Sequence, residues 1–285
     1  MADESSKIQR KPSNKSSTNV IPSTNEDSNY SILDKFSMRG RKGFVTGAAG
    51  GLGRNAAAAL AQAGADVALV DLPSQEDKLT ELAKDMSERF GTNVIALTCD
   101  VTNVEQVAEL KTQLVEQLGT VDFAFLNAGV NVPGDDQDAT EEVWTRTINI
   151  NLNGTYRTGR IAHEIMREHG HGGSLIFTAS LSGHNANYMM GSPTPVNAYG
   201  ATKAAIMEHS RYLAAALAKD GIRSNTISPD TCGLEFSMAV STCLATTLCS
   251  RSCRCIVSAR MTRLPARCSS SPATRPRTLL ALTFA

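Results

Sequence analysis

Short apolar segments alternate with longer helix-forming segments along the middle of the chain, and this alternation limits the fold more than any other feature. The apolar segments are rich in valine, leucine, isoleucine and phenylalanine. The expected strands are 44–45, 67–70, 94–97, 123–126, 174–178 and 223–227, and the expected helices are 52–63, 75–90, 104–118, 140–168 and 196–219. Short apolar strands between helices favour a parallel sheet that is covered on both faces. The sequence therefore predicts an α/β fold, a single domain built on a doubly wound parallel sheet.

The two ends of the chain differ in composition from this middle region. Residues 1–37 are rich in serine, asparagine and lysine and have no apolar period, which predicts a disordered leader. Residues 38–230 carry the strand and helix pattern and are expected to form the domain. Residues 231–285 show neither period and hold six of the seven cysteines, since only Cys99 lies earlier. We expect this tail to be irregular.

Charge and hydropathy exclude several classes of function. The 28 basic and 28 acidic side chains give a formal net charge of zero, so the chain has no electrostatic footprint for nucleic acid. No apolar run approaches the length that crosses a bilayer. The acidic, polar first residues lack the hydrophobic segment of a secretory signal, which favours a cytoplasmic location. The late cysteines lack the spacing of zinc ligands, so no metal is expected, and a small molecule is the expected partner.

A glycine-rich segment, Thr46-Gly-Ala-Ala-Gly-Gly-Leu-Gly53, lies where the first strand turns into the first helix. Its glycines allow a tight turn and close approach of the backbone, and the helix start presents free N–H groups to a pyrophosphate. Asp71 follows the second strand, where a carboxylate can accept hydrogen bonds from a ribose hydroxyl and would repel a 2′-phosphate. The segment predicts a dinucleotide site that favours NAD, with NADP as the alternative because of Arg54.

Tyr199 and Lys203 lie four residues apart in Asn197-Ala-Tyr-Gly-Ala-Thr-Lys203. On a helix this spacing places both side chains on one face. A lysine ammonium beside a phenol favours the phenolate and should lower the pKa of Tyr199 toward the range of a useful acid or base. The same spacing is common on solvated helix faces, so the pair depends on other motifs for its interpretation.

Several ordered motifs resemble those of the short-chain dehydrogenase/reductase family, over roughly residues 40 to 229. The glycine-rich segment is similar to the cofactor turn of the family, Cys99-Asp-Val101 to its adenine segment, and Leu126-Asn-Ala-Gly129 to its Asn-Ala-Gly motif. The others are Asn151 in Asn149-Ile-Asn-Leu-Asn-Gly154, Ser180 in Thr178-Ala-Ser-Leu-Ser-Gly183, the Tyr-x-x-x-Lys pair, and Ile222-Arg-Ser-Asn-Thr-Ile-Ser-Pro229. Asn149, Asn153 and Ser182 are the competing local choices.

The resemblance implies a Rossmann-like fold and hydride transfer between nicotinamide and an alcohol or carbonyl substrate. It implies that Tyr199 exchanges the proton and that Ser180 binds the same substrate oxygen. Lys203 would lower the pKa of the tyrosine and hold the nicotinamide ribose, and Asn151 would anchor a water linked to Lys203. The implied cofactor-binding residues are Gly47, Gly51, Leu52, Gly53, Asp71, Asp100, Val101, Asn127, Ala128, Gly129, Tyr199 and Lys203.

The segment 184–197, between Ser180 and Tyr199, carries polar side chains that could bind hydroxyl groups. Its His184 opening and its Pro-x-Pro before the tyrosine resemble fungal polyol and sugar dehydrogenases of the family. The resemblance favours a polyol or a ketose as substrate. The alternative is that the segment is only a connection.

The family pattern stops after Pro229, and the closing strand of the family is expected to be missing. When each codon is read from its third base, the codons permitted for 261–285 allow a sequence similar to the closing segment of the family. The tail is therefore interpreted as the product of a shifted reading frame, with a genuine disordered or redox-sensitive tail as the alternative.

Loss of the closing segment would leave one sheet edge unpaired and open a wall of the substrate cleft. The family resemblance implies a homo-oligomer, provided the chain folds properly. A dinucleotide-binding protein with little catalytic activity is the alternative function.

Overall fold

The computed structural model describes residues 36–131, 140–185, 197–229 and 255–258. The chain divides into two compact units, residues 1–35 and 36–285, and every described residue belongs to the second unit. The expected leader, except for residues 36–37, therefore lies outside the described residues. So do residues 186–196 of the substrate segment and most of the tail.

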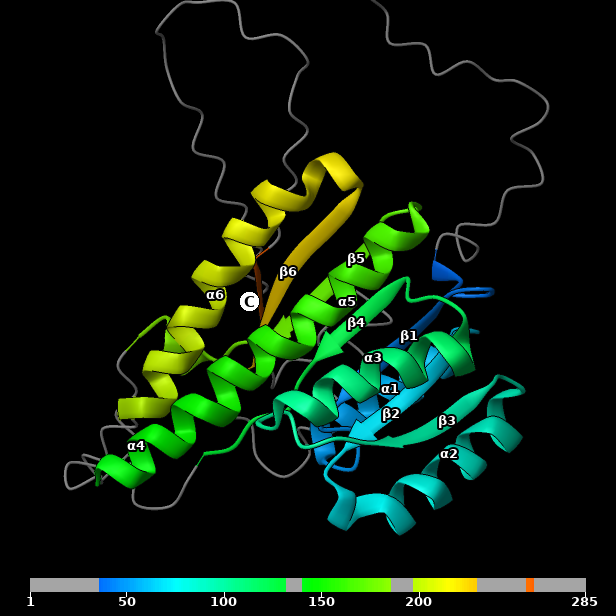
Figure 1. Cartoon of the computed structure of the whole chain (residues 1–285), viewed down its shortest axis with the longest axis horizontal. Helices are drawn as coiled ribbons and strands as arrows, with labels where there is room; N and C mark the ends of the chain where they lie inside the picture. The colour runs from blue at the N-terminus through cyan, green and yellow to red at the C-terminus, as the bar shows by residue number, and fades with distance from the viewer. Residues whose placement is uncertain (1–35, 132–139, 186–196, 230–254, 259–285) are drawn as a thin grey trace, which may run out of the picture. The chain divides into compact units, whose positions relative to one another are not determined.

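The sheet runs in the order β3-β2-β1-β4-β5-β6-β7 (Figure 1). Its strands are β1 (Lys42–Thr46), β2 (Asp66–Asp71), β3 (Val94–Thr98), β4 (Phe123–Leu126), β5 (Gly173–Thr178), β6 (Ile222–Pro229) and β7 (Cys255–Ser258). The first six strands pair in parallel. The chain adds β2 and β3 on one side of β1, and then adds β4, β5 and β6 on the other side. The predicted doubly wound parallel sheet is confirmed.

The seventh strand corrects one expectation. β7 pairs antiparallel with β6, from Thr226 opposite Ser258 to Pro229 opposite Cys255. The expectation of an irregular tail is wrong for these four residues, because the free edge of β6 offers unpaired N–H and C=O groups to any extended segment. Among the described residues, the sheet therefore continues beyond β6 with a strand of opposite direction.

The helices lie on both faces of the sheet (Figure 1). Their bounds are α1 (Gly51–Gln62), α2 (Glu76–Phe90), α3 (Val104–Leu118), α4 (Glu141–Ile148), α5 (Thr155–His169) and α6 (Asn197–Leu217), with short turns η3 (Pro73–Gln75), η5 (Leu181–Gly183) and η6 (Ala218–Asp220). Apolar residues of α1 and α2 pack on one face, and those of α3, α5 and α6 pack on the other. Successive strand residues supply the two cores, as Phe44 and Val45 do.

The helix expected over residues 140–168 is interrupted in its middle. Between α4 and α5, the six residues of η4 (Asn149–Gly154) form a π-helix, in which the hydrogen-bond ladder is wider than in an α-helix. The hydrophobic period of the sequence does not distinguish a short π-helix from an α-helix, because the π-helix adds only about one residue to the helical turn. Asn151, which the resemblance selected, lies inside this π-helix.

The parallel strands place their carboxyl ends at one edge of the sheet. Segments that follow β1, β2, β4, β5 and β6 therefore meet there, although they are far apart in the sequence. In open α/β sheets this edge, at the point where the strand order reverses, is where ligands bind. The predicted site residues belong to these segments, to the helices that begin or bend beside them, or, for Asp100 and Val101, to the segment that follows β3.

Candidate active site

The glycine-rich turn between β1 and α1 has two kinds of glycine. Gly47 has a φ of +68°, which L side chains rarely adopt, and a Cβ on Gly53 would collide with the carbonyl oxygen of Gly47. A Cβ on Gly51 would meet nothing within 4 Å. The loop itself thus requires Gly47 and Gly53, whereas Gly51 leaves open space in front of the start of α1, beside the partly buried Leu52.

The start of α1 fits an anionic group. Its N-cap is Gly50, which supplies no side-chain cap, and its first turn carries no acidic residue. The first N–H groups of a helix have no partner within the helix, and the helix dipole favours a negative charge at that end. These features fit the pyrophosphate of a dinucleotide.

Asp71 ties the end of β2 to the glycine-rich turn. Its Oδ2 accepts a hydrogen bond from the backbone N–H of Ala49 (2.9 Å), and its Oδ1 accepts one from Leu72 (2.8 Å). The side chain is only partly buried. A carboxylate oxygen can accept more than one hydrogen bond, so the group can hold the loop and still face a ribose.

Asn127 connects three strands. The hydroxyl oxygen of Thr46 accepts from the N–H groups of Asn127 (2.9 Å) and Ala128 (3.0 Å), at the end of β4. The amide of Asn127 donates to the carbonyl oxygen of Gly47 (3.4 Å), and its Oδ1 accepts from the hydroxyl of Thr178 in β5 (3.2 Å). The side chain of Asn127 therefore links the glycine-rich turn to β5. Sequence analysis selected Asn127 but missed Thr46 and Thr178, although a polar residue that ends a buried strand was a usable signal.

The segment expected to meet adenine is compact. Oδ1 of Asp100 accepts from both the N–H (2.8 Å) and the hydroxyl (2.7 Å) of Thr102, which closes a local turn. Val101 is 6% exposed, and a Cβ on Gly154 of η4 would lie 2.5 Å from its Cγ2. Val101 thus packs against the π-helix, while the partly buried Asp100 lies at the edge of the site.

Asn151 is completely buried and holds the chain after β4. Its Oδ1 accepts from the N–H of Val130 and its Nδ2 donates to the carbonyl oxygen of the same residue, both at 2.8 Å. Nδ2 also lies 3.4 Å from the hydroxyl of Thr202 in α6. The side chain of Asn151 therefore joins η4, the segment after Gly129 and α6, and Asn149 and Asn153 pair with each other at 3.3 Å instead.

Ser180, Tyr199 and Lys203 converge from two elements. Ser180 follows β5 in extended conformation, its Oγ accepts from the N–H of Ser182 (3.2 Å), and its side chain is hydrogen-bonded to Tyr199. Lys203 is 3% exposed, and its Nζ donates to the carbonyl oxygen of Thr178 (2.7 Å). The ammonium lies 5.4 Å from the centre of the Tyr199 ring.

The two ionisable groups of this cluster are shifted in ways that correct the sequence-based expectation. Burial raises the pKa of Tyr199, and the hydrogen bond with Ser180 only partly opposes this. Burial also lowers the pKa of Lys203 to about 8. The expectation that Lys203 brings the pKa of Tyr199 down is not met in this structure, because burial is the largest influence on the phenol and the ammonium donates to the carbonyl oxygen of Thr178.

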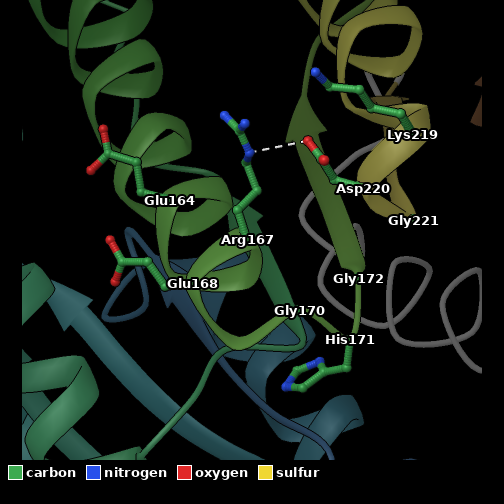
Figure 2. A pocket seen from close by; sticks show the side chains of 9 residues that line it. All are labelled: Glu164, Arg167, Glu168, Gly170, His171, Gly172, Lys219, Asp220 and Gly221. Carbon is green, nitrogen blue, oxygen red and sulfur yellow. Dashed lines mark ion pairs between the residues drawn. The ribbon is translucent and has the colours of Figure 1, made fainter.

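A separate hollow lies beside the carboxyl end of α5 and the turn η6 that follows α6 (Figure 2). Its volume is about 870 Å³, and Arg167 and Asp220 form an ion pair of 3.1 Å in its wall. The residues around it are Glu164, Arg167, Glu168, Gly170, His171, Gly172, Lys219, Asp220 and Gly221. None of the predicted site residues lines it, and it lies beside the amino ends of β5 and β6, so it does not define the active site.

Comparison with known proteins places the chain in a family. Residues 47–243 match the family model described as enoyl-(acyl carrier protein) reductase. The match extends beyond Pro229, where the motifs seen in the sequence end. Within the described residues, no helix is long and apolar enough to span a bilayer, and no cluster of three or more histidine, cysteine or acidic side chains could hold a metal ion.

Individual relatives agree with this match. The sorbose reductase sou1 of Schizosaccharomyces pombe is 39% identical over 200 residues, which cover 70% of this chain and 75% of that protein. A probable NADP-dependent mannitol dehydrogenase of Yarrowia lipolytica is 36% identical over 209 residues, or 72% of each chain. The crystal structure of a short-chain type dehydrogenase/reductase from Mycobacterium marinum gives a TM-score of 0.63 at 34% identity, covering 69% of this chain and 77% of that one. The chain belongs to the short-chain dehydrogenase/reductase family.

Proposed function

We propose that the protein catalyses hydride transfer between a nicotinamide dinucleotide and a secondary alcohol or ketone, with Tyr199 as the acid and base. The observation that carries this proposal is the convergence of Tyr199, Ser180 and Lys203 beside the carboxyl edge of the sheet. The glycine-rich turn lies at the same edge and fits a dinucleotide. Membership of an oxidoreductase family supports the assignment.

Each polar group of the cluster has a role in moving or stabilising a proton. Tyr199 gives its phenolic proton to a substrate oxygen during reduction and removes a proton from the substrate hydroxyl during oxidation. Ser180 donates to the same oxygen and stabilises the charge that develops on it. The bound nicotinamide would supply or accept the hydride.

Lys203 and Asn151 act on the other side of the tyrosine. Lys203 has a pKa of about 8, so it can hold or release a proton near neutral pH, and we assign it to the nicotinamide ribose and to proton exchange. Asn151 fixes the segment around Val130 through both ends of its amide. Its role as the anchor of a water linked to Lys203 remains a proposal.

We assign the substrate to the polyols and ketoses. The support is the naming of the relatives from Schizosaccharomyces pombe and Yarrowia lipolytica as sorbose reductase and mannitol dehydrogenase. The segment 184–197 also carries polar side chains of a kind that can bind hydroxyl groups, and residues 186–196 of it lie outside the described part. A cytoplasmic location and a homo-oligomeric state are proposed on the sequence alone.

Replacement of Tyr199 by phenylalanine tests the proposal. We expect kcat for polyol oxidation to fall by about 10³-fold, the typical contribution of a general acid or base, with NADH affinity changed less than about twofold. Tyr212→Phe, at a site 71% exposed on the same helix, is the control and should keep full activity. Unchanged turnover in Tyr199→Phe would contradict the proposal, and NADH binding by the native protein without turnover would favour the non-catalytic alternative.

We propose NAD as the preferred cofactor, although the mannitol dehydrogenase relative is named as NADP-dependent. Asp71 supports NAD because its partly exposed carboxylate would repel a 2′-phosphate. Asp71→Asn keeps an oxygen acceptor for Ala49 and removes the charge. We expect the ratio of kcat/KM with NADPH to that with NADH to rise about tenfold in this variant. A native preference for NADPH, or an unchanged ratio, would contradict this assignment.

A further inference from the structure

The η5 turn that follows Ser180 lies in direct backbone contact with α6. A Cβ on Gly183 would lie 2.8 Å from the carbonyl carbon of Lys203, closer than real Cβ contacts allow. A Cβ on Gly200 would lie 3.1 Å from the carbonyl oxygen of Ser182. The glycines thus let the turn that begins at Ser180 rest on the part of α6 that carries Tyr199 and Lys203.

His184 fastens the other end of this turn. Its Nε2 lies 2.9 Å from the hydroxyl oxygen of Ser228, near the carboxyl end of β6, and the two side chains share a hydrogen bond. Ser228 is 2% exposed, and its hydroxyl also lies 3.9 Å from the sulfur of Met207 in α6. One buried hydroxyl therefore links the turn after Ser180, the last parallel strand and the helix of Tyr199.

This link bears on the position of the Ser180 hydroxyl. The N–H groups of Gly183 and His184 donate to the carbonyl oxygens of Ser180 (3.0 Å) and Leu181 (2.9 Å), and these bonds tie His184 to Ser180 through the backbone of the turn. At its amino end, Ala179 donates to Ile227 of β6 at 2.8 Å. Hydrogen bonds thus tie residues on both sides of Ser180 to β6. This strand lies next to α6, the helix that carries Tyr199.

We propose that His184 is a positioning residue, which acts through Ser228 to hold the η5 turn and thereby keeps the Ser180 hydroxyl in contact with Tyr199. The inference rests on the proposed function and adds a residue to it. Catalytic groups must be held to within about 0.5 Å of their productive geometry. The side chain of His184 is exposed and contributes little to the core. Its removal should therefore change the position of Ser180 more than the stability of the fold.

The hydrogen bond between Ser180 and Tyr199 provides a direct measurement. Because this bond lowers the pKa of Tyr199, any displacement of Ser180 should raise it. We would titrate the Tyr199 phenol by ultraviolet difference spectroscopy, using Tyr199→Phe to subtract the other four of the five tyrosines. The variants are Ser180→Ala, His184→Ala, His184→Gln and Ser228→Ala, and the neighbouring Asn185→Ala is the matched control.

We expect His184→Ala and Ser228→Ala to raise the pKa of the Tyr199 phenol, as Ser180→Ala should. Both variants should also lower kcat for polyol oxidation about tenfold, with a smaller change in KM. The double variant should be no worse than either single one, because both remove one link. His184→Gln, whose amide can replace the ring nitrogen, should titrate like the native protein, as should Asn185→Ala.

Two results would overturn the inference: a native pKa for Tyr199 in His184→Ala while Ser180→Ala shifts it, or no shift in Ser180→Ala itself. A shift in Asn185→Ala as large as that in His184→Ala would also overturn it, since the effect would then belong to the loop as a whole. The titration requires no turnover. A native protein that oxidises no polyol therefore defeats the proposed function and leaves this measurement decisive for the positioning role.

Discussion

The first part of the described chain, residues 36–131, and the second part, residues 140–185 with 197–229, bury different kinds of side chain. In the first part the buried residues are almost all apolar, and Thr46 is the one buried polar side chain there. In the second part, buried polar or charged side chains are frequent. They are Thr147, Asn151, Thr155, Thr158, Thr178, Thr202, Lys203, Ser210, Ser224, Thr226 and Ser228.

The two parts also differ in how their strands are covered. Val67, Ala68, Leu69 and Val70 of β2 are all fully buried, because helices lie on both faces. In β6, buried residues alternate with partly buried or exposed ones, and Ile176 of β5 is only partly buried. Buried polar groups cost free energy unless they are hydrogen-bonded. The first part therefore buries almost only apolar side chains, whereas the second adds buried polar groups to its share of the apolar core.

The strongest test compares one core residue from each part. Leu69→Ala in β2 should lower the free energy of unfolding by about 4 kcal/mol, since it removes a completely buried side chain and leaves a cavity. Ile176→Ala in β5 should cost only about 1.5 kcal/mol, because its surroundings are partly open. Urea unfolding measures both. Equal losses would show that the second part is as tightly packed as the first.

Much of this fold could be predicted because it depends on local patterns. The strand 123–126 was predicted with its observed bounds, and the other five parallel strands and the glycine-rich turn were found within a few residues. Apolar runs and glycines report the conformation of their own segment. The doubly wound topology then follows from the order of the elements.

What could not be predicted depends on contacts between distant segments. The π-helix around Asn151 needs the partner at Val130, twenty-one residues earlier, and the pairing of β7 needs the free edge of β6. The direction of the pKa shift of Tyr199 was misjudged because helical spacing shows neither the burial of the phenol nor the hydrogen bond from Lys203 to Thr178. The link between His184 and Ser228 joins residues forty-four positions apart, so no sequence spacing revealed it.

Lys203 provides a second test, since it is the one buried lysine among the described residues. Burial lowers its pKa from 10.5 to about 8, so between these pH values the unfolded chain binds more protons than the folded one. The contribution of Lys203 to the free energy of unfolding should therefore rise with pH, by about 3 kcal/mol between pH 8 and 10.5, and stay at its lower level below pH 8. The measurement is a series of urea unfolding curves across this range.

Lys203→Met is the matched variant for this effect, because it keeps the length of the side chain and removes the titrating group. Its stability should lack the rise between pH 8 and 10.5, so the difference between native and variant curves isolates the lysine. Parallel curves would mean that Lys203 keeps its ordinary pKa and that the second part buries no costly charge.

The smallest effect concerns the contact between the two parts. Lys111 of α3 donates to Glu164 (3.2 Å) and Glu168 (2.7 Å) of α5, and its pKa is raised chiefly by the hydrogen bond with Glu168. Because these side chains are 28–57% exposed, Lys111→Met should cost only about 0.5 kcal/mol. The contribution should be present below pH 10.5 and disappear as the pH rises through the higher pKa of the folded state.

Salt distinguishes an ion pair from packing at this contact. The stability lost in Lys111→Met should shrink in 1 M salt, where screening acts over about 3 Å, whereas a loss caused by packing would remain. Lys84→Met is the control, because Lys84 is exposed on α2 and has no ion pair with the described residues. A loss in Lys111→Met that exceeds about 2 kcal/mol and resists salt would mean that apolar packing of the lysine stem joins the two parts.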